Sequence, residues 1–90
     1  MAAVAFEWDE ANLGHLEKHG FTRADAEAVV TDPRRVRVDT YNARGERRYG
    51  VIGRGTGGDI LHVVFVLRQG NIRPFHCRAA TPAEKRRYRR

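Results

Sequence analysis

The sequence has little cysteine and no long apolar stretch. A single cysteine, Cys77, excludes an internal disulfide and fits a reducing compartment, although it also fits a small core residue. No apolar stretch approaches the roughly 20 residues that a membrane-spanning helix needs, and the N-terminus lacks the basic start of a signal peptide. We therefore expect a cytoplasmic protein that does not associate with membranes.

Lysine is also scarce, and acidic residues are few after residue 33. The chain has 15 arginines but only two lysines, and its formal net charge is +6. Residues 1–33 carry a net charge of −5, whereas residues 34–90 carry +11. Because the planar guanidinium suits phosphate oxygens, this asymmetry favours contact with RNA or DNA. A solvated surface or a face for an acidic protein partner would also explain it.

The 90 residues are predicted to form one domain over positions 1–90, with a single two-layer core. The apolar run Ile60–Arg68 predicts a central strand that is covered on both faces, with turn residues on either side. We predict an α+β fold in the order β-α-α-β-β-β-β-α, whose antiparallel sheet packs against an N-terminal helical hairpin and a C-terminal helix. The expected elements are strand 5–8, helices 10–19 and 22–32, strands 35–39, 46–53, 60–68 and 72–78, and a helix from 81.

Helix ends and strand edges are marked by particular residues. Asp9 is expected to cap the first helix, and Thr22 and Thr81 are expected to begin capping boxes for the other two. Gly20 is expected to end the first helix. Pro74 cannot donate a backbone hydrogen bond, so the last strand should be an edge strand or carry a bulge there.

Several fragments, in order, resemble one known family. They are FEWD, a helix ending in KHG, a second helix ending in DP, then ERRYGVIG, IRPFHCRAAT and EKRRY, which together span Phe6 to Tyr88. This set resembles the BrnT toxins of type II toxin–antitoxin modules. The resemblance implies a RelE-like fold and a ribonuclease that halts translation. It also implies a BrnA-like ribbon-helix-helix antitoxin as partner and contact with operator DNA only through that antitoxin.

One segment departs from the family pattern. The family usually has an aliphatic-rich stretch before the arginine that is Arg78 here, whereas this chain has Pro74, Phe75 and His76. The geometry of a site at this place is therefore expected to differ from that of other members.

A ribonuclease that uses no metal needs a base, an acid, and cations for the developing phosphorane charge. We expect this chemistry, with no cofactor and no metal, because the acidic residues lie mainly on the predicted helices. Glu46, Arg47 and Arg48 match the family's ERR motif. We expect Glu46 to act as a base and the two arginines beside it to bind phosphate. Strand alternation places the two arginines on opposite faces. The alternative is a surface strand start with a local ion pair.

Arg78 is the residue most expected to stabilise the phosphorane, because it matches the family and ends a strand beside the basic C-terminal helix. If alternation continues past Pro74, His76 lies on the same face and is a candidate acid or base. A partly buried histidine that makes one hydrogen bond is the alternative.

The remaining candidates lie near helix ends. Lys18 and His19 match the family's KHG, with Lys18 a catalytic candidate and His19 an RNA contact; alternatively, both complement the helix dipole. His15 and His19 have the spacing of a metal pair but lack an evident third ligand. Arg86 and Tyr88 are candidate RNA contacts by charge and stacking, or else part of a solvated helix end.

Two other functions remain open from the sequence. A ParE-like toxin that inhibits gyrase would need no catalytic residues. A non-catalytic RNA-binding module would also explain the basic charge, but the chain carries no aromatic RNA-recognition motif.

Overall fold

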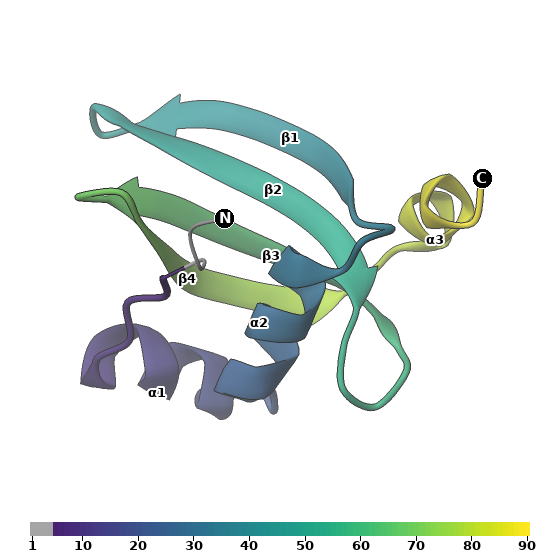
Figure 1. Cartoon of the computed structure of the whole chain (residues 1–90), viewed down its shortest axis with the longest axis horizontal. Helices are drawn as coiled ribbons and strands as arrows, with labels where there is room; N and C mark the ends of the chain where they lie inside the picture. The colour runs from purple at the N-terminus through teal and green to yellow at the C-terminus, as the bar shows by residue number, and fades with distance from the viewer. Residues whose placement is uncertain (1–4) are drawn as a thin grey trace.

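The computed structural model describes residues 5–90, which form three helices and a four-stranded antiparallel sheet (Figure 1). The elements are α1 (Glu10–Lys18), α2 (Arg23–Thr31), β1 (Val36–Ala43), β2 (Glu46–Arg54), β3 (Ile60–Arg68), β4 (Asn71–Ala79) and α3 (Pro82–Tyr88). The strands lie in the order β1-β2-β3-β4. The α+β class and the antiparallel sheet are therefore confirmed. No helix in this part of the chain is both long and apolar enough to span a membrane.

The first predicted strand, over residues 5–8, is wrong. Phe6 forms one isolated parallel bridge with Ile72, in which the Glu7 amide donates to the Ile72 carbonyl at 2.8 Å and the Ile72 amide donates to the Ala5 carbonyl at 2.9 Å. The chain cannot continue this pairing because Asp9 already caps α1. The predicted order therefore fails in its first element, and this segment only lies along the outer edge of β4.

The expected helix caps are present. The Asp9 carboxylate accepts hydrogen bonds from the first backbone amides of α1, and Thr22 and Thr81 each form a capping box with the residue three positions on. Gly20, with a φ of +86°, follows the end of α1 in the left-handed region that glycine adopts readily.

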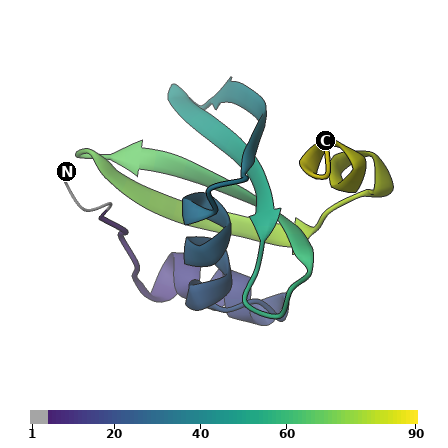
Figure 2. The same cartoon turned by 45° about the vertical axis from the view of Figure 1, so that its right-hand side comes forward.

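The two N-terminal helices cover different strands. α1 packs mainly against β4, whereas α2 packs against β2 and β3 (Figures 1 and 2). The two N-terminal helices do pack against the antiparallel sheet as predicted, and each buries its own apolar residues on it. Leu16 of α1 and Val29 of α2 are fully buried, and burying a side chain of this kind contributes about 1.5–3 kcal/mol.

The sheet has a different cover on each face. We call the side that packs on α1 and α2 the α1/α2 face; its core residues are Leu16, Ala26, Val29, Val30, Val51, Leu61, Val63 and Cys77. On the opposite side, the α3 face, Ile52, Ile60, Ala80 and Tyr88 form a second core cluster. Residues 60–64 of β3 are all buried, which confirms a central strand covered on both faces.

A bulge interrupts β4 beside Pro74. Pro74 pairs with Phe65, and His76 pairs with Val64, so Phe75 is an extra residue in this edge strand. Both expectations for Pro74 are therefore confirmed. Past the bulge, His76 and Arg78 lie opposite Val64 and His62 of β3, so they share the α3 face.

Candidate functional site

Arg48 and Phe75 meet across the sheet. The Cζ atom of Arg48 lies 4.9 Å from the centroid of the Phe75 ring, which is within the range of a cation–π contact. The Nε atom of Arg48 is buried and has no hydrogen-bond partner among residues 5–90. Val66 of β3, which pairs with Arg48, is buried. The bulge in β4 thus holds an aromatic ring against a guanidinium with an unused buried donor.

Three histidines gather where α1 meets β4. The ring centroids of His15 and His19 are 4.8 Å apart, and those of His15 and His76 are 6.0 Å apart. Burial lowers the pKa of His76 below its ordinary value of 6.5, and the nearby charges of His15 and Arg78 lower it further. His76 is therefore neutral at pH 7 and can accept a proton. Within residues 5–90, no three potential metal-ligating side chains of His, Cys, Asp or Glu are grouped for metal binding.

A small cleft of about 280 Å³ lies beside these histidines and includes His15, Arg73 and Phe75 in its lining. The amide of the buried Asn12 donates to the carbonyl of Pro74 at 2.8 Å, which ties α1 to the bulge. Arg73 does not offer a free charge to this cleft. Its guanidinium donates to the Asp9 carboxylate at 2.8 and 3.1 Å, and this pairing raises the pKa of Arg73.

Arg78 forms a two-pronged ion pair with Glu84. Nη1 and Nη2 of Arg78 donate to the two carboxylate oxygens of Glu84 at 2.8 and 3.0 Å, and Nη1 also donates to the Ala79 carbonyl at 3.1 Å. These bonds occupy three of the five N–H donors of a guanidinium. The Arg78 side chain is still 40% exposed, so its remaining donors can reach a ligand.

Glu84 is held from two sides. Its carboxylate also accepts a hydrogen bond from the backbone amide of Thr81 at 2.9 Å, and together with Arg78 this lowers the pKa of Glu84 to about 2. Nε2 of the buried His62 lies 4.0 Å from the carboxylate. Burial lowers the pKa of His62, and neither of its ring nitrogens has a partner in the described part of the chain. Glu84 is therefore a weak base that anchors α3 to β4.

Comparison with protein families identifies the chain. Residues 8–84 match the family described as "Ribonuclease toxin, BrnT, of type II toxin-antitoxin system". The chain belongs to the BrnT toxin family. No curated protein matches its sequence. The resemblance inferred from the motifs is thus confirmed, and with it, at the level of the family, come a ribonuclease activity and an antitoxin partner.

The ERR motif of this BrnT chain lies at the start of β2, beside the turn from β1. Glu46 pairs with Ala43, and Arg47 is exposed on the face opposite Arg48. No salt bridge of Glu46 occurs among residues 5–90. Of this motif, only Arg48 reaches the bulge of β4. Lys18 lies exposed in the last turn of α1, next to the histidine group.

The two candidates of the C-terminal helix differ in exposure. Arg86 is exposed, but Tyr88 is only 6% exposed. The Tyr88 hydroxyl donates to the Asp32 carboxylate at 2.6 Å, and Cζ of Arg54 lies 5.5 Å from the ring centroid. The ring of Tyr88 therefore fills the core under α3 and is not open to a base in this structure.

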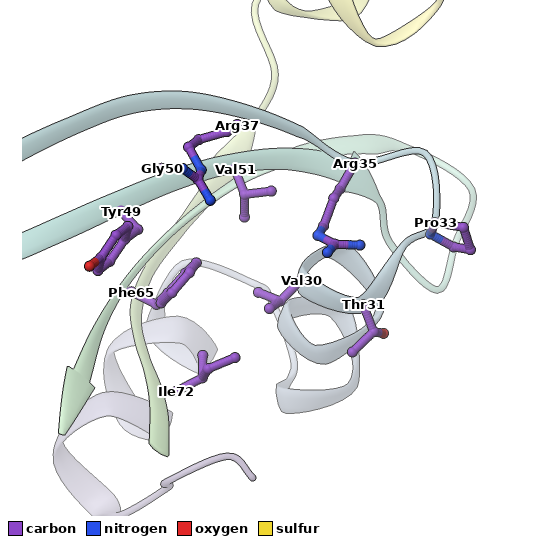
Figure 3. A pocket seen from close by; sticks show the side chains of 10 residues that line it. All are labelled: Val30, Thr31, Pro33, Arg35, Arg37, Tyr49, Gly50, Val51, Phe65 and Ile72. Atoms are coloured by element: carbon purple, nitrogen blue, oxygen red, sulfur yellow. The ribbon is translucent and has the colours of Figure 1, made fainter. Parts of the chain in front are cut away.

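A second hollow lies on the α1/α2 face, between the end of α2 and β1 (Figure 3). It encloses about 790 Å³ and is lined by Val30, Thr31, Pro33, Arg35, Arg37, Tyr49, Gly50, Val51, Phe65 and Ile72. The alternation of arginine and valine at 35–37 predicts a half-exposed strand but not a groove. The groove depends on where α2 stops covering the sheet.

Several of the predicted site residues lie on β4 or near it. Arg48, His76 and Arg78 share the α3 face. His19 lies beside His15, and His15 lies beside His76. Residues that the sequence reasoning did not include are Phe75, His15 and Glu84. Their only sequence signals were the departure from the family pattern, the i, i+4 histidine spacing and the capping box.

Proposed function

We propose that this BrnT chain is a metal-independent endoribonuclease whose cleavage site lies at the β4 edge of the sheet, between the α3 face and the histidine group of α1. The observation that supports this most strongly is the bulge. It places the Phe75 ring under the Arg48 guanidinium, one residue before His76, whose pKa is lowered. An aromatic ring, a cation and a neutral imidazole are the groups needed to hold a base, bind a phosphate and accept a proton.

In the proposed reaction, the ribose 2′-hydroxyl attacks the adjacent phosphorus and the 5′-oxygen leaves. His76 takes the proton from the 2′-hydroxyl, with Glu46 as the alternative base. Arg48 stabilises the phosphorane charge. The two remaining donors of Arg78, which lies further along the α3 face, bind a neighbouring phosphate. Lys18 protonates the leaving oxygen. The products are a 2′,3′-cyclic phosphate and a 5′-hydroxyl end.

Other exposed residues contact the RNA further from the scissile bond. His19 supplies a hydrogen-bond donor, and Arg86 supplies charge. Arg47 contributes from the opposite face of β2, to a more distant phosphate. We assign Tyr88 to holding α3 in place rather than to stacking on a base, because its ring is buried.

The test is cleavage of a defined single-stranded RNA by the purified protein in EDTA, with the product ends mapped. We expect cyclic phosphate ends, and a loss of at least about 100-fold in rate for His76→Gln and for Arg48→Gln, the range of a single acid–base or electrostatic group. Arg23→Gln, which removes an exposed arginine of α2, is the matched control and should cleave normally. Cleavage only with added magnesium would contradict the mechanism. Intact RNA together with gyrase inhibition would favour the ParE-like alternative.

We further propose that the chain is neutralised by a BrnA-like antitoxin with a ribbon-helix-helix domain, and contacts operator DNA only through it. The charge of +11 over residues 34–90 supports binding of an acidic antitoxin segment in the cytoplasm. Toxin–antitoxin affinity should therefore fall as sodium chloride is raised from 50 to 500 mM. Association that is insensitive to salt would count against this interface.

We also infer that residues 1–90 are one domain with a variant of the RelE-like fold. Support comes from the continuous antiparallel sheet with a core cluster on each face and a terminal helix at one end. Unfolding in a single transition, with the same midpoint by fluorescence and by circular dichroism, would agree with this.

A further inference from the structure

The groove beside β1 exists because α2 leaves part of the sheet uncovered. α2 packs on β2 and β3, so the adjoining strand β1 has no helix on this face (Figures 1 and 3). Val30 at the end of α2 and Val51 of β2 are buried at its floor. The groove, of about 790 Å³, is thus a preformed concave surface separate from the α3 face of β4.

Two arginines give the groove a positive wall. Arg35 and Arg37 are exposed, and both guanidinium groups point from the β1 side toward the hollow (Figure 3). Arg35 donates to the backbone carbonyl of Asp32 at 3.1 Å, and no hydrogen bond or ion pair of the Arg37 side chain occurs among residues 5–90. None of the ten lining residues is acidic. An anion entering the groove would therefore meet two charges that no lining carboxylate neutralises.

Opposite the arginines, two aromatic rings stack on each other. Tyr49 and Phe65 are directly paired on β2 and β3, and their rings are stacked with centroids 5.3 Å apart and an interplanar angle of 17°. Both side chains are only partly buried. A stacked, partly exposed ring pair beside two cations is the combination with which proteins bind unpaired nucleotides.

We infer that this groove binds single-stranded RNA, with a base against Tyr49 and Phe65 and phosphates on Arg35 and Arg37. The inference rests on the proposed function and deepens it, since it adds a binding site for nucleotides that flank the cleaved bond. The groove and the cleft beside the histidines share no lining residue, although Ile72 of the groove and Arg73 of the cleft are neighbours in β4.

The binding test uses a fluorescein-labelled ten-nucleotide RNA with 2′-O-methyl groups, which lack the attacking hydroxyl and are not cleaved. Affinity is measured by fluorescence anisotropy between 50 and 300 mM sodium chloride. The double variant Arg35→Gln/Arg37→Gln should bind about 10-fold more weakly at 100 mM salt. Its slope of log affinity against log salt should fall by about 1.4, or about 0.7 for each lost phosphate contact.

The aromatic surface is tested separately with Tyr49→Leu, which keeps an apolar side chain but removes the flat ring. This variant should lose about 10-fold in affinity and keep the wild-type salt slope. Arg23→Gln is the control, because Arg23 begins α2 and lies about 12 Å along the helix from the groove residue Thr31. Thermal unfolding of each variant shows whether it is folded.

The outcomes separate the groove from the cleavage site. Folded groove variants that bind the probe as the wild type does would overturn the inference, and would assign the groove to a protein partner if antitoxin binding were lost. Weaker binding of the probe by these variants would support the groove as an RNA-binding site. If the wild type nevertheless cleaved no RNA, the proposed ribonuclease would fail and the groove would stand as an RNA-binding site.

Discussion

The ion pair between Arg78 and Glu84 can be tested by replacing Glu84 with glutamine. A glutamine still accepts the hydrogen bond of the Thr81 amide, so the capping box of α3 is preserved. Only the negative charge that faces Arg78 is removed. The substitution therefore isolates the charge interaction that fastens α3 to β4.

The expected size of the effect comes from the pKa of Glu84. Its fall from an ordinary value of 4.5 to about 2 corresponds to about 3 kcal/mol. Part of this shift comes from the Thr81 amide, whose hydrogen bond glutamine keeps, and solvent screens part of the rest because the Arg78 side chain is 40% exposed. We therefore expect about 2 kcal/mol. A lowered carboxyl pKa stabilises the fold above pH 4.5, and this stabilisation is lost as the pH falls toward 2. At pH 2.5 about a quarter should remain, which is about 0.5 kcal/mol.

The assay is urea unfolding followed by the fluorescence of Trp8, at pH 7 and at pH 2.5. Glu84→Gln should be less stable than the wild type by about 2 kcal/mol at pH 7 and by about 0.5 kcal/mol at pH 2.5. Glu17→Gln, an exposed carboxylate of α1, should show little difference at either pH. An equal deficit for Glu84→Gln at both pH values would refute the argument from charge, and no deficit at pH 7 would refute the ion pair as an anchor.

Three further predictions concern stability and reactivity. Gly53→Ala should destabilise the protein by about 1–3 kcal/mol, because the added Cβ would lie 2.8 Å from a backbone carbonyl of α2; Gly57→Ala, with open space around it, is the control in the same urea assay. Tyr88→Phe should cost about 1.5–3 kcal/mol through loss of its hydrogen bond to the Asp32 carboxylate, and an unchanged unfolding midpoint would contradict this. Burial raises the pKa of Cys77 to about 12, so a thiol reagent at pH 8 should label it only in urea; rapid labelling of the native protein would contradict its burial.

Local sequence signals predicted the elements from α1 onward. Asp9, Thr22 and Thr81 cap the three helices by accepting hydrogen bonds from backbone amides two or three residues on. Pro74 marks the irregular edge strand because it has no backbone N–H to donate. Both effects are local, so the sequence alone predicts them. The predicted strand at residues 5–8 failed because a short apolar segment has no local signal for how many bonds it will make. The nearby helix cap limited this segment to a single bridge, which it makes with the edge strand β4.

The candidate site depends on contacts that strand alternation does not specify. The extra residue at the bulge brings Phe75 to Arg48, and the packing of α1 on β4 brings His15 to His76. The two arginines of the ERR motif could be predicted to lie on opposite faces, because successive side chains of a β-strand alternate between the two faces. The burial of Tyr88 was not, because it follows from where the C-terminal helix lies on the sheet.

Not all of the arginines are free to bind RNA, because several of them pair with carboxylates. Arg68 and Arg73 pair with carboxylates of the N-terminal segment, and another arginine of β4 is fastened to the start of α3. By contrast, Arg35, Arg37 and Arg48 form no ion pair within residues 5–90, and each adjoins an aromatic ring or an aromatic-lined groove. Since a carboxylate partner neutralises the charge of a guanidinium and occupies some of its donors, phosphate should bind more strongly to the unpaired arginines. The acidic N-terminal segment thus secures the edge of the sheet, while these unpaired arginines lie at the two surfaces that we propose bind RNA.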